Sequence, residues 1–239
     1  MRILLGILVL CLATGLAVPA RAQRAPVINE FVFNHTGIDT SEFIEIFGEP
    51  SADLSAFTIL GIEGDGTNAG IVDNVFSVGM TDGGGFWTTS FLNNILENGT
   101  LSLLLVGSFT GVVGQDLDAD NDGVLEVTPW TLVIDSVAVF DGGVSDLAYG
   151  TVLLAPDFDG GTLPVGGASR IPNGFDTNNV ADWVRNDFEG AGLPGFIVEA
   201  NPGEAINTPG DVNTVAVPEP ATLVLAALGA LGLFLRRRS

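Results

Sequence analysis

Short segments that mix apolar and polar residues, separated by glycine-rich breaks, are the feature of this sequence that most restricts its fold. The clearest segment, residues 42–47, combines the acidic Glu42 and Glu45 with apolar residues at the other four positions. A short segment of this kind predicts a strand with one face in the core and the other in solvent. Further strand-like segments are residues 27–33, 57–62, 101–106, 131–140 and 149–154. Many short strands with glycine between them indicate an all-β domain, most simply a β-sandwich.

The N-terminus has the organisation of a secretory signal. Arg2 precedes a run of apolar and small residues from Ile3 to Val18, and the triplet Ala20-Arg21-Ala22 follows. This order of basic, apolar and cleavage regions predicts a helical signal peptide over residues 1–22, and a mature chain that begins near Gln23. Cys11 is the only cysteine and lies inside this signal, so the mature protein has no disulfide to stabilise it.

The C-terminus combines a short motif, an apolar run and a basic cluster. The motif is Val217, Pro218, Glu219 and Pro220; the uncharged stretch 221–235 follows, and the chain closes on Arg236, Arg237, Arg238 and Ser239. Fifteen apolar residues in a helix reach about 23 Å, which is short for a transmembrane helix but sufficient if flanking groups extend to the interface. The arginines would stay on the cytoplasmic side. On hydropathy alone, this tail is an ordinary anchor helix.

The order of these three parts is more specific than hydropathy. Pro-Glu-Pro before a short helix and a terminal arginine cluster resembles the PEP-CTERM sorting signal, here over residues 217–239. The resemblance implies that an exosortase-type membrane protease recognises the tail at the inner membrane, removes it and passes the protein to the cell surface or outside. It also implies association with a bacterial exopolysaccharide or biofilm layer. The stretch from Asn201 to Val215 is the only candidate spacer before this signal.

The segment between the two ends is strongly acidic. Residues 24–217 hold three arginines against 28 acidic residues, a net charge of −25, and the whole chain contains no lysine. Such a field repels nucleic acid and anionic lipid, and it attracts cations, including divalent ones. We therefore expect no nucleic-acid partner.

A second resemblance rests on five short segments. They are residues 28–31, 42–46, 53–59, 135–139 and 208–213. Their order resembles the lamin-tail domain, an immunoglobulin-like β-sandwich of nuclear lamins and many secreted bacterial proteins. The resemblance implies one domain over residues 27–213. This chain is longer than the compact family pattern, and we expect the extra residues at 64–95 and 155–200 to form long loop insertions or an added subdomain.

The densest polar feature is the acidic stretch 116–126. Carboxylates at every second position of a loop can converge on one hard cation, and a following glycine permits the sharp turn that EF-hand loops need. In that register Gly123 makes the turn, and the predicted calcium ligands are Asp116, Asp118, Asp120, Asp122, the Val124 carbonyl and Glu126. Pro129 stands where the EF-hand has a bidentate glutamate, so the loop would connect strands. The alternative is a solvated acidic turn.

Few residues of the mature chain could support catalysis. His35 is its only histidine, and without cysteine or lysine a triad or a zinc site is disfavoured. Arg170 most simply has a structural role, in which its planar guanidinium pairs with carboxylates or carbonyls. The tryptophans, Trp87, Trp130 and Trp183, could form a ligand-stacking platform, although core packing explains such residues more often.

These observations predict an exported, non-enzymatic protein with a structural or adhesive β-sandwich. Two alternatives remain open. A secreted carbohydrate-binding module would expose at least two of the tryptophans on one face. A secreted hydrolase would place two carboxylates, or His35 with an acid and a serine, in a deep cleft.

Overall fold

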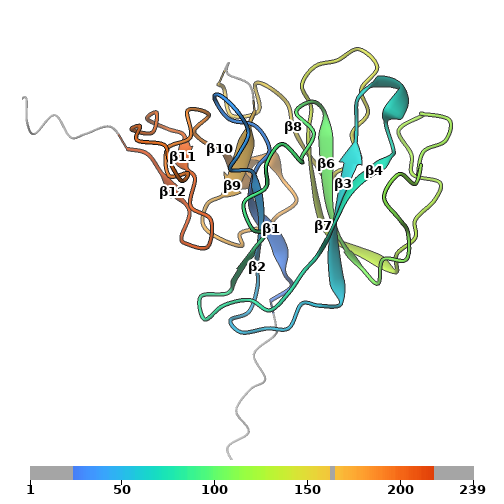
Figure 1. The fold of residues 1–239 in the computed structure, drawn as a ribbon, viewed down its shortest axis with the longest axis horizontal. Helices are drawn as coiled ribbons and strands as arrows, with labels where there is room; N and C mark the ends of the chain where they lie inside the picture. The colour runs from blue at the N-terminus through green and yellow to red at the C-terminus, as the bar shows by residue number, and fades with distance from the viewer. Residues whose placement is uncertain (1–23, 162–164, 218–239) are drawn as a thin grey trace, which may run out of the picture.

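The chain folds into two five-stranded sheets in a computed structural model that describes residues 24–161 and 165–217 (Figure 1). The first sheet has the order β10-β9-β1-β2-β5 and the second the order β4-β3-β6-β7-β8, while β11 and β12 form a separate pair. The strands are β1 Val27–Val32, β2 Phe43–Phe47, β3 Phe57–Glu63, β4 Val72–Ser77, β5 Phe86–Thr88, β6 Leu101–Gly107, β7 Leu132–Val139, β8 Val152–Leu154, β9 Gly167–Arg170, β10 Trp183–Arg185, β11 Ala205–Ile206 and β12 Thr214–Val215.

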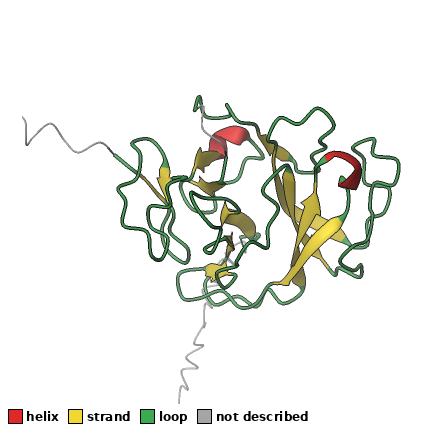
Figure 2. Cartoon of the chain, turned by 45° about the horizontal axis from the view of Figure 1, so that its top comes forward, coloured by secondary structure: helices red, strands yellow, loops and turns green. Residues whose placement is uncertain are grey.

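The all-β class predicted from the sequence is confirmed for the described residues, in a sandwich-like arrangement (Figure 2). The pairings between these strands are antiparallel, except that β8 runs parallel to β7. Helical structure in the described ranges consists of two 3-10 turns, Gly66–Asn68 and Val180–Asp182. None of the helices described there is long and apolar enough to cross a membrane. The predicted signal peptide, and the sorting tail after Val217, lie outside the described residues.

The main core lies between the two sheets. Ile28, Ile44 and Ile46 of the first sheet belong to the same buried cluster as Leu103 and Val137 of the second. β6 is buried along its whole length, because its odd-numbered leucines face this core while Leu104 and Val106 belong to a second cluster on the other face of the sheet. Each of the six segments expected as strands overlaps an observed strand, because the apolar residues that marked these segments are the ones that the fold buries.

The extra residues at 64–95 and 155–200 were expected to form long loops or an added subdomain, and they contribute strands to both sheets. The first stretch supplies β4 and β5, which pair with β3 and β2 at the edges of the two sheets. The second stretch supplies β9 and β10, which extend the first sheet beyond β1. The insertions therefore widen both sheets.

The outer face of β2 was expected in solvent, and this prediction is wrong. Glu45 has 0% of its surface exposed. The cause is the C-terminal part of the chain, because residues 201–216, called the strap below, lie against the outer face of the first sheet (orange to red in Figure 1). Glu42, just before β2, is buried too, but by the loop between β5 and β6, where it accepts from the Ile95 and Leu96 backbone N–H groups. The strap includes β11 and β12 and the buried Asn207 and Asn213, so the expected spacer from Asn201 to Val215 is part of the folded domain.

Arg170, at the end of β9, joins the two sheets. Its Nη2 donates to both carboxylate oxygens of Asp135 on β7, at 3.2 and 3.1 Å, and its Nε donates to the Ile28 carbonyl at 2.9 Å. Its Nη1 lies 3.0 Å from Asp176 and 3.5 Å from Asp182, and the guanidinium stacks on Trp183 at 4.4 Å. The side chain has no exposed surface. The expected structural role of Arg170, pairing with carboxylates and a carbonyl, is confirmed.

Replacing Arg170 should strongly destabilise the fold. Arg170→Lys keeps the charge but cannot bond Asp135 through two donors while also reaching Ile28, so we expect a loss of about 3 kcal/mol in the free energy of unfolding. Arg24→Lys is the matched control, since Arg24 is exposed and stacks only on Phe47. Urea unfolding compares the two variants, and equal stabilities would contradict a sheet-joining role for Arg170.

A second buried polar group lies between the first sheet and the strap. Glu30 of β1 and Glu45 of β2 are register partners, and both side chains are fully buried. Glu30 accepts from the Asn186 amide and the Thr208 backbone N–H, and Glu45 accepts from the Asn29 amide and the Gly210 backbone N–H. Burial raises the pKa of Glu30 to about 7, and burial together with the neighbouring Glu30 raises the pKa of Glu45 to about 8.

This carboxylate pair predicts that stability falls as the pH rises. Because the folded pKa lies above the unfolded value of 4.5, the stabilisation is complete below that value and is lost as the pH approaches about 8. Between about pH 5 and pH 9 we expect a loss of roughly 3 to 5 kcal/mol in the free energy of unfolding. Glu45→Gln cannot ionise, so its profile should be clearly flatter in urea unfolding, whereas exposed Glu199→Gln should follow the wild type. Parallel profiles for all three proteins would refute this assignment.

Candidate metal centre

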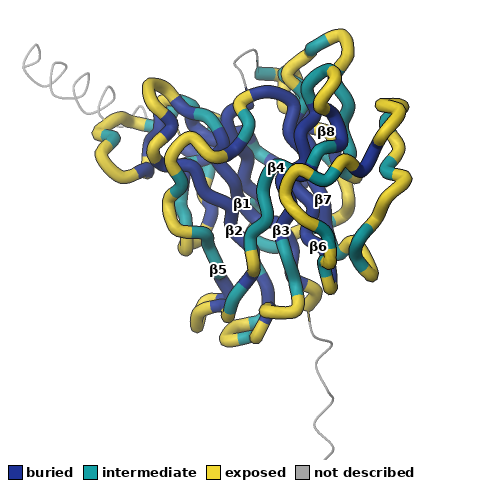
Figure 3. Tube along the Cα trace, turned by 45° about the vertical axis from the view of Figure 1, so that its right-hand side comes forward, coloured by how far each residue is buried: buried dark blue, intermediate teal, exposed yellow. Residues whose placement is uncertain are grey.

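The acidic loop lies on the outer face of the second sheet, in the connection from β6 to β7 (Figure 3). Leu117 is fully buried there in one cluster with Leu60, Ile62, Val72, Leu104 and Val106, and Leu125 packs against the same cluster. The Leu117 N–H donates to the Gly70 carbonyl, and the Val127 N–H donates to the Leu117 carbonyl. These two leucines fix both ends of the turn that carries the carboxylates.

Four of the predicted ligands converge. Asp118, Asp120, Asp122 and Glu126 each offer one carboxylate oxygen, and these oxygens lie within 4.8 Å of one another. Asn121 and Gly123 adopt positive φ angles of 52° and 86°, which turn the chain back so that alternate side chains point inward. An arrangement of four carboxylates is chemically suited to one hard divalent cation.

Asp118 is the anchor of this loop. Its carboxylate accepts from the backbone N–H groups of Asp122 at 3.1 Å and Gly123 at 2.9 Å, and from the Tyr149 hydroxyl at 2.8 Å. Desolvation alone would raise the pKa of Asp118, but these hydrogen bonds, led by that of Tyr149, lower it below its usual value. Burial, followed by the bond to Asp118, raises the pKa of Tyr149. Asp118 is therefore held ionised at the base of the loop.

The other two predicted ligands, Asp116 and the Val124 carbonyl, stay predictions, and both residues make contacts inside the loop. Asp116 is not one of the four converging residues, and its Oδ1 accepts from the Asp118 backbone N–H at 3.1 Å. Val124 is exposed, and its backbone N–H donates to Asp122 at 2.9 Å. Both contacts shape the turn, so they stabilise the positions of Asp118 and Asp122.

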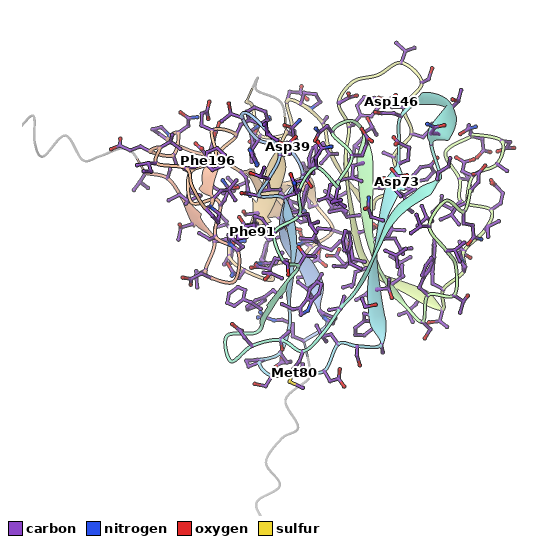
Figure 4. All side chains as sticks on the ribbon, viewed as in Figure 1. Asp39, Asp73, Met80, Phe91, Asp146 and Phe196 are labelled. Atoms are coloured by element: carbon purple, nitrogen blue, oxygen red, sulfur yellow. The ribbon has the colours of Figure 1, made fainter. Side chains whose placement is uncertain are left out.

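Three further groups of carboxylates were missed by the sequence analysis. Their members come from separate loops and strands: Glu63, Asp73 and Glu97; Asp65, Asp141 and Asp146; Asp187, Glu189 and Glu204. Figure 4 shows Asp73 and Asp146 on the side of the second sheet, away from Phe196. Burial is the main cause that raises the pKa of Glu63 to about 7. The acidic composition signals that such groups exist, but only the fold brings their members together.

The three tryptophans do not share an exposed face. Trp183 has 3% of its surface exposed and lies in the main core against Arg170. Trp87 packs against the main core, whereas Trp130 packs against the second cluster on the outer face of the second sheet. Trp87 and Trp130 are half-buried, and the clusters that they pack against lie on opposite faces of the second sheet.

His35 is buried as well, with 2% of its surface exposed. Its Nδ1 lies 3.1 Å from the Thr36 carbonyl and 3.8 Å from Asp39, and the Phe196 ring packs on it edge-on with centroids 5.0 Å apart. A general base must reach a bound substrate. The position of His35 under Phe196 does not offer that access.

One comparison with known proteins gives a match. Residues 216–238 match the PEP-CTERM protein-sorting motif. No curated protein and no solved structure matches the chain. The motif supports an exported protein that exosortase, a membrane enzyme, sorts and processes, and it implies a cell-surface or extracellular location. The match covers the tail, so it carries no information about the fold of the domain.

If the acidic loop binds calcium, the thermal stability of the domain should depend on calcium. Calcium should raise the melting temperature of the wild type, and Asp120→Asn should remove most of that rise, because Asp120 is an exposed member of the converging group. Asp118→Asn should be less stable by about 1 to 3 kcal/mol even in excess chelator, since it weakens the bonds to Tyr149 and Gly123. Identical melting of the wild type in calcium and in chelator would show an ordinary acidic turn.

Proposed function

We propose that this protein is an exported, non-catalytic component of the cell surface or extracellular matrix, whose tail is removed by exosortase and whose β-sandwich has a structural or adhesive role. The observation that carries the proposal is the sorting motif at residues 216–238, placed directly after a packed domain that ends at Ala216. The burial of His35 and its cover by Phe196 support a role without catalysis.

The proposal includes an immunoglobulin-like, lamin-tail-like arrangement of the domain. Its support is the position of the resembling segments, since residues 28–31, 42–46, 53–59 and 135–139 lie on or beside β1, β2, β3 and β7. These four strands contribute to both sheets around the main core. The segment 208–213 lies in the strap, where its backbone donates to Glu30 and Glu45.

We also propose that calcium stabilises the domain through Asp118, Asp120, Asp122 and Glu126. A protein that has no disulfide in its mature chain gains stability from any ion that binds only the folded form. At free calcium a hundredfold above the dissociation constant, this linkage contributes about 2.7 kcal/mol. Without a bidentate glutamate at the end of the loop, the expected dissociation constant is on the order of 0.1 to 1 mM, as in extracellular modules.

The polymer partner in this proposal is a surface polysaccharide, and its support is the PEP-CTERM resemblance. The strongly negative domain favours contacts that a divalent cation bridges over direct contacts with an anionic polymer. A carbohydrate-binding module built on the three tryptophans is the weaker alternative, since Trp183 is buried. A hydrolase that uses His35 is weaker still, because this histidine is buried against Phe196.

Removal of the tail is the direct test of this function. Mass spectrometry of protein extracted from the cell surface should find peptides up to the strap and none that reaches Leu235. Replacing Pro218 and Glu219 with alanine should keep the tail attached, because the sorting motif is then lost, while replacing Arg24 should not affect processing. Recovery of the intact C-terminus in mature wild-type surface protein would rule out exosortase processing.

A further inference from the structure

The strap ends where the sorting motif begins. The matched motif starts at Ala216, whose backbone N–H donates to the Glu204 carbonyl at 2.8 Å and whose carbonyl accepts from the Gly203 N–H at 2.9 Å. Val215 is paired with Ala205 in the β11–β12 ladder. Val217 is the first residue past this network, and 80% of its surface is exposed. The junction between the domain and the tail is therefore held by backbone hydrogen bonds up to its last residue.

A protease needs several residues of extended chain on each side of the bond that it cuts, and segments held in a fold become accessible only when they open locally. On the N-terminal side of Pro218, the docked strap leaves Val217 alone outside its hydrogen bonds. Cleavage close to the Pro-Glu-Pro sequence thus competes with the docking of the strap.

The docking contacts come mainly from neutral donors on the strap and acceptors on the sheet. The Thr208 N–H donates to Glu30 at 3.0 Å, and the Gly210 N–H donates to Glu45 at 2.6 Å. The buried amide of Asn213 donates to the carbonyls of Asn29 at 3.3 Å and Arg170 at 3.1 Å. Two carboxylates and one asparagine hold the strap at its centre.

We propose that the strap is a latch on tail processing: docked on Glu30, Glu45 and Asn29 it withholds the junction from exosortase, and its release presents the junction for cleavage. This inference rests on the proposed processing by exosortase. It adds a step that the domain itself controls, because the residues that complete the fold lead directly into the motif and hold the chain in hydrogen bonds up to Ala216.

The charged groups around the strap determine how its docking depends on pH. Glu30 and Glu45 face each other from β1 and β2, Asp82 adds its charge near Glu45, and Asp187 lies buried behind Asn207. The hydrogen-bond partners of Glu30 and Glu45 are the neutral groups of Asn29, Ser169, Asn186, Thr208 and Gly210. Ionisation of both carboxyls places two buried anions side by side, so alkaline pH should favour the open strap.

Hydrogen exchange on the full-length chain in detergent tests the latch without any enzyme. Asn213→Ala removes the central amide, and we expect roughly tenfold faster exchange of the amides of residues 205–216 while those of β6 stay protected. Thr208→Val is the milder second variant, since it removes only a hydroxyl that bonds Glu30 and Asn213. The matched control is Asn93→Ala, on an exposed loop between β5 and β6. The pH dependence is a further test.

As the pH rises, exchange of the wild-type strap amides should accelerate more than the intrinsic exchange rate of an unfolded amide does. Glu45→Gln should remove this additional acceleration, because residue 45 can then no longer ionise.

Pulse-chase labelling in cells that contain exosortase then follows tail removal. We expect faster removal in Asn213→Ala and Thr208→Val than in the wild type and in Asn93→Ala. Faster strap exchange with unchanged tail removal would overturn the latch while leaving the processing itself intact. Strap amides that exchange only with the whole domain in both variants would also overturn it. A wild-type tail that is never removed would instead refute the proposed function, and with it the latch.

Discussion

The contact between Arg170 and Asp135 connects the two sheets, and much of the surrounding structure depends on it. Asp135 also accepts from the Ile28 N–H at 2.8 Å, so one carboxylate binds β1 and β9 to β7. Removing either partner would leave an uncompensated charge inside the core, which is far more costly than losing a surface ion pair. The stacking of the guanidinium on Trp183 and its bond to Asp176 fix the segment that follows β9.

The basic residues of this acidic domain are concentrated inside it. Arg185 also has little exposed surface, bonds Asp159 through two nitrogens and lies over Phe158. Arginine suits such sites because its planar donors satisfy several acceptors at once and its charge persists at any physiological pH. With two of three cations used in this way, the surface carries most of the negative charge, including the clustered carboxylates of the loops. Such a surface attracts counter-ions.

The sequence predicted those parts of the fold whose signal is local. The apolar residues of 42–47 located β2, and the leucines of 101–106 located β6, because short apolar segments of this kind become buried strands. The convergence of Asp118, Asp120 and Asp122 was also predictable, since the spacing within one loop determines it. Strands β9 to β12 have two to four residues each, too few for a periodic pattern to form. The burial of Glu45 could not be predicted either, because the residues that cover it lie more than 160 positions away.

Both sheets are covered on their outer as well as their inner faces. The strap lies on the first sheet, and the β6–β7 connection with Leu117 and Trp130 lies on the second. A flat, open sheet face is the usual platform on which sandwich proteins receive an elongated ligand. Here the chain itself covers part of both outer faces, the first through the strap and the second through the β6–β7 connection. A molecule that bound either covered region would first have to displace a segment of this chain, together with the hydrogen bonds and apolar contacts that hold it.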